Sequence, residues 1–239
     1  STVSNTDGSI TSSVRANQSA GFSIVTYTGT GSNATVGHGL NAEVEFLITK
    51  DRSNANSWHF QHSATGNTKA LFLNGVGAAV ANGAYWNNTT PTSSVFSVGT
   101  ADGMNGSGSN YVAYCFAPVT GFSAFGSYTG NASADGPFVH TGFRPALIII
   151  KCSSTSNSYT NWDINDSARD TFNVADATLA ANLSDAENTV NIGTQKIDFL
   201  SNGFKIRQGT SSSKNLSGAT YVWAAWAENP FQANGGLAR

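Results

Sequence analysis

Short runs of apolar and β-branched residues, separated by Gly, Asn and Ser, recur along the chain from Gly21 onward. Runs of this length, bounded by turn residues, are typical of β-strands, and their number predicts antiparallel sandwiches. The first half contains expected strands at 22–27, 44–49, 70–73, 95–98 and 111–117. The second half contains them at 124–128, 146–151, 196–200, 204–207 and 221–227. Residues 174–188 show only weak helical spacing, which predicts a long loop with at most one helical turn.

The two halves repeat each other in sequence. Gly21-Phe22-Ser23 opens one stretch and Gly121-Phe122-Ser123 another, and each continues through Tyr-Thr-Gly and a histidine to an apolar run that ends in lysine. A period of about 100 residues is longer than the roughly 20 to 50 residues of a solenoid repeat, so it indicates two tandem domains. We interpret the chain as an internal duplication. The predicted parts are an arm or linker at 1–20, sandwiches at 21–119 and 120–231, and a tail at 232–239.

Two local patterns add detail to this prediction. Asn202-Gly203 lies between the apolar runs 197–200 and 204–206, and because Asn-Gly readily adopts positive φ, a tight hairpin is expected there. In the last strand, 221–227, both alternating faces carry apolar or aromatic side chains. One face is expected to lie in the core, and the other is expected to meet a partner domain or subunit.

The chain is poor in charge. Charged residues make up 11% of the 239 residues, against about a quarter in typical proteins, and Ser, Thr, Asn and Gly dominate the polar positions. Such hydroxyl and amide surfaces are common on extracellular and virion proteins. The net charge of -2, with no cluster of Lys or Arg, argues against nucleic-acid binding. Neither a membrane-spanning apolar run of roughly 20 residues nor a signal peptide is visible, so membrane insertion is not expected.

The two cysteines do not occupy matching positions in the repeat, so a repeated disulfide is excluded. A single bridge between Cys115 and Cys152 and a pair of free thiols both remain open, and the apolar neighbours of Cys115 favour free, buried thiols. Free thiols fit folding in a reducing cytosol. The chain starts at Ser1 without Met, which is expected either after trimming of the initiator or in a piece of a longer polypeptide.

Residues with catalytic or metal-binding chemistry are few. His59 and His62 are three residues apart, so on a strand their rings point to opposite faces and do not share a metal. His38 and His140 occupy matching places before the apolar strand of each half, which favours a turn or core histidine over a ligand. The sequence contains no Ser-His-Asp motif, phosphate loop or CxxC motif. We therefore assign no catalytic residue and do not expect an enzyme.

The densest acidic cluster offers oxygen ligands at a spacing that can wrap Ca²⁺, although it lacks the central Gly and terminal Glu of an EF-hand. Its candidate ligands are Asp163, Asn165, Asp166 and Asp170. The favoured alternative is a turn in which Asp166 contacts Arg169 while the other carboxylates are solvated, so no cofactor is expected. A glycosidase needs two carboxylates about 5 to 9 Å apart in a cleft. The sequence leaves Asp163 and Asp166 open as such a pair, but nothing else in it builds a cleft around them.

Tryptophans in polar surroundings are the candidates for glycan binding, because sugar sites combine an aromatic face with amide and hydroxyl groups. The candidates are Trp86 with Asn87, Trp58 and Trp162. Trp58 and Trp162 occupy matching positions in the two halves, which favours a shared packing role. Trp86 has no counterpart and is the best sequence candidate for an exposed aromatic.

The following segments carry a family resemblance: SVRANQSAGFSIVTYTGTGSNATVGHGL (13–40), WNNTTPTSSVFSVGT (86–100), NGSGSNYVAYCFAPVTGFSAFGSYTGN (105–131), DGPFVHTGFRPALIIIK (135–151), IDFLSNGFKIR (197–207) and AENPF (227–231). Together they resemble an uncharacterised domain of tailed-phage virion proteins, common in marine and cyanobacterial phages. The resemblance covers nearly the whole chain and implies a concanavalin-like or lectin-like jelly-roll sandwich. It implies a place in a tail fibre or other virion surface protein, but it supplies no catalytic or ligand-binding residues. The sequence departs from the family pattern at Glu43-Val44-Glu45, Trp223 and Trp226, which concern packing.

The resemblance and the composition predict a virion surface protein that is made in the host cytoplasm and has other virion proteins as partners. The first hypothesis is a tail-fibre or spike module that attaches to a host-surface glycan or protein. The alternative is a purely structural component without a ligand, such as a head fibre, capsid decoration or tail appendage. A glycan-degrading spike is a minor alternative. Fibres and spikes are commonly homotrimers, so the resemblance implies a homo-oligomer, with a trimer favoured. The two-faced strand at 221–227 and the unpatterned arm also indicate an oligomer.

Overall fold

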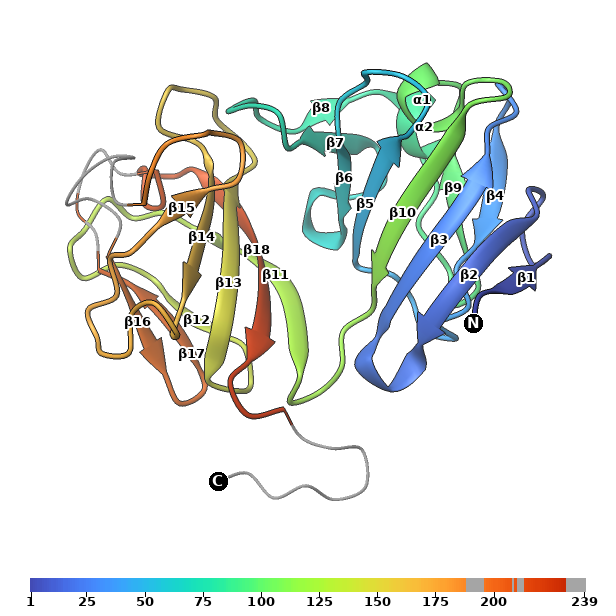
Figure 1. The fold of residues 1–239 in the computed structure, drawn as a ribbon. Coiled ribbons are helices and arrows are strands. Elements are labelled where there is room, and N and C mark those ends of the chain that lie inside the picture. Colours follow the sequence, from blue (N-terminus) through green and yellow to red (C-terminus); the bar gives the residue numbers. More distant parts are fainter. Residues whose placement is uncertain (188–195, 208, 210–212, 231–239) are drawn as a thin grey trace. The chain divides into compact units, whose positions relative to one another are not determined.

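The computed structural model describes residues 1–187, 196–207, 209 and 213–230, and this part of the chain is built mainly from antiparallel β-sheets (Figure 1). The prediction of an all-β fold is confirmed. The chain divides into two compact units: unit 1 comprises residues 1–74 and 79–119, and unit 2 comprises residues 75–78 and 120–239. No helix in the described ranges is long and apolar enough to cross a membrane.

Unit 1 contains an eight-stranded sheet in the order β1-β2-β3-β10-β5-β6-β7-β8. Its strands are β1 (Val3–Asn5), β2 (Ser12–Asn17), β3 (Phe22–Thr28), β5 (Phe46–Asp51), β6 (His59–His62), β7 (Lys69–Phe72), β8 (Val80–Ala81) and β10 (Asn110–Phe116). A second, two-stranded sheet pairs β4 (Ala34–Gly37) with β9 (Val95–Val98). The short helical turns are η1 (Gln18–Ala20), η2 (Ser63–Thr65), α1 (Gly83–Trp86) and α2 (Asp102–Asn105).

The core of unit 1 lies between its two sheets. Alternation along β3 buries Ser23, Val25 and Tyr27 and turns Ile24 outward. From the smaller sheet, the ring of Phe96 lies edge-on to Tyr27 with the ring centroids 6.1 Å apart. Because both layers contribute to one buried apolar cluster, the unit is a β-sandwich.

Unit 2 contains a five-stranded sheet in the order β11-β18-β13-β14-β15 and a three-stranded sheet in the order β12-β17-β16. The larger sheet comprises β11 (Ser123–Thr129), β13 (Pro145–Cys152), β14 (Trp162–Asp166), β15 (Leu179–Ala180) and β18 (Thr220–Ala227). The smaller comprises β12 (Phe138–His140), β16 (Ile197–Leu200) and β17 (Gly203–Ile206). Trp223 of β18 meets Phe204 of β17 edge to face, with centroids 5.8 Å apart, so these two sheets also enclose a common core.

The two units share a set of equivalent contacts. The hydroxyl of Tyr27 donates to the carbonyl of Met104 at 2.7 Å, and the hydroxyl of Tyr128 donates to the carbonyl of Lys214 at 2.8 Å. In unit 1 the N–H of Thr30 donates to Asn105 Oδ1, and in unit 2 the N–H of Asn131 donates to Asn215 Oδ1, both at 2.8 Å. The hydroxyl oxygen of Tyr111 accepts from the N–H of Gly106 at 2.8 Å, and that of Tyr221 accepts from the N–H of Leu216 at 2.9 Å. Internal duplication stays an interpretation, but the bonds establish that Met104 and Lys214 occupy equivalent places.

Residues 1–20 are not the arm that the sequence predicted. β1 pairs with β2, and β2 pairs with β3, so the segment extends the large sheet of unit 1. Val14 is buried in the core, and the hydroxyl of Ser12 donates to the carbonyl of Gly37 at 2.8 Å. Polar residues, chiefly Ser and Asn, make up most of these strands, which hides the alternation of apolar and polar positions that marks a strand. The predicted tail, 232–239, lies outside the described residues.

The predicted hairpin around Asn202-Gly203 is confirmed, but for a different reason. Leu200 pairs with Gly203, so the turn consists of Ser201 and Asn202. Neither Asn202 nor Gly203 has a positive φ. Glycine is needed here because β12 passes close by: a Cβ on Gly203 would lie 2.1 Å from the carbonyl oxygen of Val139.

Two further expectations concern unit 2. The stretch predicted as a long loop carries no helix over residues 174–187, the part that the structure describes, and it contributes the two-residue strand β15. In β18, Tyr221, Trp223 and Ala225 belong to the core cluster, so the prediction that one face of this strand is core is confirmed. A partner for its other face stays a prediction.

Candidate functional site

Trp86 is not exposed, contrary to the sequence prediction. It ends α1, a single helical turn capped by Asn82, whose side chain accepts a hydrogen bond from the N–H of Ala84 at 2.9 Å. The turn directs the indole into the core of unit 1, where it is fully buried in the same cluster as Phe96. Asn87 follows as the C-cap, with φ of 50°. Trp86 and Asn87 therefore do not form a sugar-binding surface. The polar residues beside Trp86 in sequence suggested an exposed ring, but the helical turn directs the ring inward.

The other two candidate tryptophans differ in exposure. Trp162 is buried, whereas Trp58 is partly exposed and stacks on Tyr114 with the ring centroids 6.4 Å apart and the planes at 21°. The backbone N–H of Trp58 donates to Asn74 Oδ1 and that of Trp162 to Asn182 Oδ1, both at 2.9 Å. The matched bonds support the shared packing role, and of the three predicted tryptophans only Trp58 offers a ring to solvent.

The acidic cluster does not assemble as a metal site. Along β14 the side chains alternate, so Asp163 and Asn165 share the core face while Asp166 lies on the other face. Arg169 donates to Asp166 from Nε at 2.5 Å and from its backbone N–H at 2.8 Å. Asp170 Oδ2 accepts the backbone N–H of Ala177 at 2.6 Å. No group of three or more His, Cys, Asp or Glu side chains in the described ranges is arranged to hold a metal ion. Since Asp163 and Asp166 face opposite sides, they also do not form the carboxylate pair of a glycosidase.

His59 and His62 lie on opposite faces of β6, as the spacing predicts. His59 is on the core face, and its Nδ1 lies 3.0 Å from the carbonyl oxygen of Ser57. His62 caps η2, because its Nδ1 accepts the backbone N–H of Ala64 at 3.1 Å. The pair is part of the packing of unit 1.

His38 is the buried turn histidine that the sequence predicted. Its Nε2 lies 3.2 Å from the carbonyl of Thr92, and its Nδ1 accepts the N–H of Leu40 at 3.3 Å. His140, its predicted counterpart, is instead exposed at the end of β12. The prediction that the two histidines play the same role is therefore wrong. His140 lies on the exposed face of β12, whereas His38 lies in the buried turn after β4.

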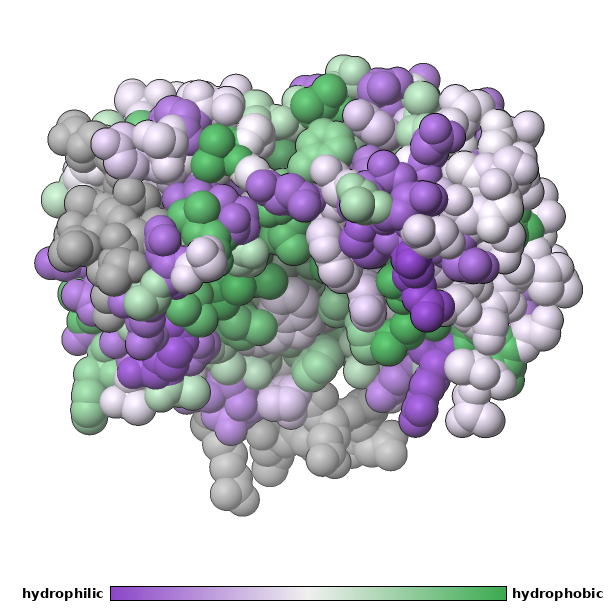
Figure 2. Space-filling view, turned by 45° about the horizontal axis from the view of Figure 1, so that its top comes forward, coloured by the Kyte–Doolittle hydropathy of each residue, from purple (hydrophilic) through white to green (hydrophobic). Residues whose placement is uncertain are grey.

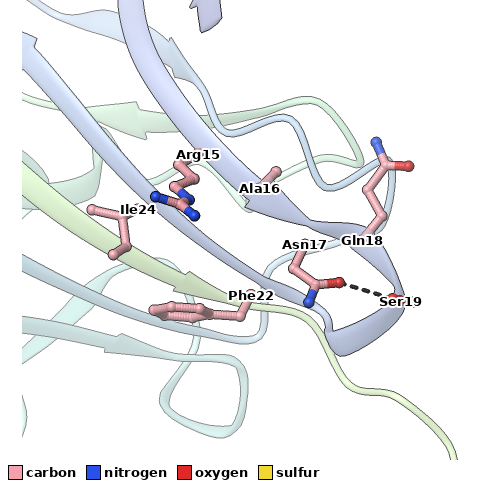
Figure 3. A pocket seen from close by; sticks show the side chains of 7 residues that line it. All are labelled: Arg15, Ala16, Asn17, Gln18, Ser19, Phe22 and Ile24. Carbon is pink, nitrogen blue, oxygen red and sulfur yellow. Dashed lines mark hydrogen bonds between the residues drawn. The ribbon is translucent and has the colours of Figure 1, made fainter. Parts of the chain in front are cut away.

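An open hollow of about 700 Å³ lies on unit 1 where β2 turns into β3 (Figure 3). Its lining is Arg15, Ala16, Asn17, Gln18, Ser19, Phe22 and Ile24. Strand pairing sets this composition, because Arg15 lies directly opposite Ile24 and Asn17 directly opposite Phe22. Directly opposed residues of an antiparallel pair share one face. Arg15 and Asn17 therefore each stand beside an apolar side chain, on the face of the sheet that points away from the core.

Neighbouring residues hold two side chains of the hollow in place. The ring of Phe22 packs against Phe116 with the centroids 4.8 Å apart. Asn17 Oδ1 accepts from the hydroxyl of Ser19 at 2.8 Å and from the N–H of Ala20 at 3.2 Å, so its amide nitrogen points away from Ser19 (Figure 3). None of the ion pairs among the described residues involves Arg15, whose side chain is exposed. A guanidinium and an amide group thus stand beside an aromatic and aliphatic floor.

A second hollow, of about 510 Å³, is lined chiefly by threonine and serine hydroxyls from β1, β2 and β3, together with Arg52 and Asn110. The aromatic residues in its lining, Tyr27 and Tyr111, are buried in the core. It offers hydrogen-bonding groups without an exposed ring, so it lacks the stacking surface that sugar sites use.

Unit 2 contains a fully buried polar cluster. Lys214 Nζ donates to Asn165 Oδ1 at 2.7 Å and to Thr178 Oγ1 at 3.2 Å. Asn165 Nδ2 in turn donates to Thr178 Oγ1 at 2.8 Å. Asp163 Oδ2 accepts from the hydroxyl of Ser213 at 2.7 Å, while Asp163 Oδ1 is buried without a hydrogen-bond partner. The cluster places an amine, a carboxamide and a carboxyl group inside the sandwich.

Burial governs the protonation of this cluster. It lowers the pKa of Lys214 to about 8, against the opposing influence of Asp163. It raises the pKa of Asp163, although Lys214 and the Ser213 hydroxyl act to lower it. In a medium of low polarity a charged ammonium and carboxylate are both disfavoured relative to the neutral amine and acid.

Unit 1 has no such cluster at the equivalent place. Met104 stands where unit 2 has Lys214, as the matched tyrosine bonds show. His59 pairs with β5 as Asp163 pairs with β13, and Gln61 follows His59 as Asn165 follows Asp163. Sequence reasoning found Asp163 and Asn165 but placed them in a solvated turn, and it missed Lys214, because only the fold brings residues 49 positions apart together.

Residues 1–230 match the model of a family described as a domain of unknown function, DUF7483. The chain belongs to this family. The match spans both units and covers the residues of the hollow on unit 1 and of the buried cluster in unit 2. No curated protein and no solved structure matches the chain.

Proposed function

We propose that this DUF7483 protein is a virion surface protein, a tail-fibre or spike module that attaches to a glycan on the host surface. The observation that carries the proposal is the hollow beside β2 and β3, where Arg15 and Asn17 stand next to Ile24 and Phe22. The resemblance of the chain to phage virion proteins supplies the biological setting.

The chemistry of the hollow suits a sugar. A pyranose presents a C–H face that packs against aromatic and aliphatic side chains, and hydroxyls around its rim that need donors and acceptors. Phe22 and Ile24 supply the apolar floor, while the Arg15 guanidinium and the amide nitrogen of Asn17 supply the hydrogen-bonding groups. A guanidinium additionally favours an acidic sugar, because it donates two parallel hydrogen bonds to a carboxylate.

The rest of the surface fits an exposed virion position. Much of the surface visible in Figure 2 is pale, the colour of residues with intermediate hydropathy such as Ser, Thr and Gly. Low charge and many hydroxyl groups keep such a surface soluble without strong nonspecific attraction to charged partners. We propose in addition that the protein acts as a homo-oligomer, with a trimer favoured, beside other virion proteins. If the full-length protein has the mass of a monomer in solution, the proposal of a homo-oligomer is wrong.

Binding of labelled protein to host cells and to an array of host glycans tests attachment. We expect binding by the wild type, and about a 10-fold loss of affinity for Arg15→Ala, which corresponds to one charge-assisted hydrogen bond. The matched control is Arg52→Ala, which removes an arginine from the hydroxyl-lined hollow and is expected to bind as the wild type.

Two results count against the proposal. If the assembled wild-type protein does not bind host cells at micromolar concentration, the purely structural role is favoured. If Arg15→Ala binds as tightly as the wild type, attachment uses another surface. Release of sugars from host polysaccharide during long incubation would point instead to the glycan-degrading alternative.

A further inference from the structure

The amine of Lys214 and the carboxamide of Asn165 meet inside unit 2. Nζ lies 2.7 Å from Asn165 Oδ1, and the two residues are 49 positions apart in the chain. Lys214 and Asn165 are almost completely shielded from solvent, as is Asp163, which shares the core face of β14 with Asn165. We propose that Lys214 and Asn165 form an intramolecular isopeptide bond between Nζ and Cγ, with Asp163 as the proton carrier and ammonia as the leaving group.

The reaction balances without any further reagent. Asp163 takes one proton from the Lys214 ammonium, and the free amine attacks Cγ of Asn165. The C–N bond to Nδ2 then breaks while a second proton moves from Nζ to Nδ2, so that ammonia departs. The reactants are one ammonium, one carboxamide and one carboxylate; the products are a secondary amide, ammonia and a neutral carboxylic acid. No oxidant or reductant takes part.

The surroundings of the pair favour each step. Burial lowers the pKa of Lys214 to about 8, so the nucleophilic free amine is accessible near neutral pH. Burial raises the pKa of Asp163, which suits a carboxyl group that has to hold a proton. Asn165 is fixed in place because its Nδ2 donates to Thr178 Oγ1 at 2.8 Å and to the carbonyl of Ala177 at 3.2 Å. Because the fold already holds the two reacting groups in contact, the reaction does not have to supply the entropy cost of bringing them together.

Formation of the crosslink also removes two buried charges. A buried ammonium facing a buried carboxylate is costly to desolvate, whereas an amide and a neutral acid are not charged. Lys151, the other fully buried lysine of unit 2, lies instead against the backbone carbonyls of Val76, Cys152 and Thr160. It faces no carboxamide in these bonds, so the crosslink is specific to Lys214. The bond would tie β14 to the segment that leads into β18.

Unit 1 provides an internal comparison, because it presents Met104 at the place of Lys214 and Gln61 at the place of Asn165. A methionine has no nucleophilic nitrogen. The crosslink is therefore expected in unit 2 alone, once per chain.

Mass spectrometry of the purified full-length protein under denaturing conditions tests the proposal. We expect the intact mass to be lower than the sequence mass by one ammonia. After trypsin, the peptides that contain Asn165 and Lys214 should appear as one branched species, without cleavage after Lys214. Lys214→Met, which copies unit 1, and Asp163→Ala are both expected to show the full sequence mass.

Two controls separate the crosslink from other losses of ammonia. Asn202→Ser removes the Asn-Gly sequence that forms a succinimide, and it is expected to keep the mass loss. Lys205→Met removes a lysine that pairs with Asp135 at 2.7 Å, and it is expected to keep the mass loss as well. The proposal is overturned if the wild type has the full sequence mass, or if the loss of ammonia disappears in Asn202→Ser.

Discussion

Gly103 lies so close to His59 that a Cβ on the glycine would come within 2.3 Å of the imidazole Cε1. The glycine belongs to α2, which covers the core face of β6 at this point. At the equivalent place in unit 2, Ser213 donates to Asp163 at 2.7 Å. The two units therefore fill the same position in different ways: one with a bare glycine over a ring, the other with a hydroxyl over a carboxylate.

Gly103→Ala is expected to destabilise unit 1, because the methyl group forces the imidazole or α2 to move. Overpacking of this kind costs about 1 to 3 kcal/mol. Urea unfolding followed by tryptophan fluorescence measures the loss. Gly77→Ala is the matched control, since nothing lies within 4 Å of its Cβ position, and it is expected to change the free energy of unfolding by less than about 0.5 kcal/mol. Equal stability of both variants would show that the space above His59 is not tight.

The stability of unit 1 is expected to fall in mild acid because of His59. Burial lowers the pKa of His59 from 6.5 to about 4, with Lys50 adding to the effect. Since the unfolded chain binds the proton first, stability is complete above pH 6.5 and is lost as the pH falls toward about 4. The loss amounts to about 3 kcal/mol.

The free energy of unfolding, measured from pH 7 down to pH 4, checks this expectation. His59→Gln should make the profile less steep because it removes one titrating ring, and the dependence that remains includes that of His38, whose pKa burial also lowers. His140→Gln, at an exposed histidine, is the control for the substitution itself and should keep the free energy of unfolding that the wild type has at pH 7. A wild-type profile that stays flat over this interval contradicts a buried, neutral His59.

The buried hydroxyls of Tyr27 and Tyr128 are expected to contribute equally to their units. Each donates to a backbone carbonyl, that of Met104 and that of Lys214 respectively. Tyr→Phe at either position leaves a buried carbonyl without this donor, which costs about 1 to 3 kcal/mol. Unfolding measured for Tyr27→Phe and Tyr128→Phe compares the two units directly. Tyr159→Phe, at an exposed tyrosine, is the control and should be neutral.

Cys115 and Cys152 are expected to resist thiol reagents in the folded protein. Both are free and buried, and burial raises the pKa of Cys115 to about 12, so the reactive thiolate is scarce. Titration with a chromophoric disulfide should detect no thiol in the native protein and both thiols in denaturant. Rapid labelling of native protein would contradict their burial, and absence of labelling in denaturant would indicate a disulfide.

The sequence by itself determined the fold class and part of the packing. Alternating runs such as Tyr221 to Ala227 read as strands because the period of two residues is a local property of the backbone. Opposite faces for His59 and His62 followed from the same rule. The repeated Tyr-Thr-Gly segments pointed to two similar halves, and the tyrosines Tyr27 and Tyr128 make equivalent bonds.

Only the tertiary structure decided which side chains are accessible and which meet. Trp86 has polar neighbours in sequence, yet one helical turn places it in the core. The hollow at Arg15 exists because strand pairing sets Arg15 opposite Ile24, and the contact of Lys214 with Asn165 joins distant segments. Burial and long-range pairing depend on how strands from different parts of the chain pack together, and no local pattern of residues encodes that arrangement.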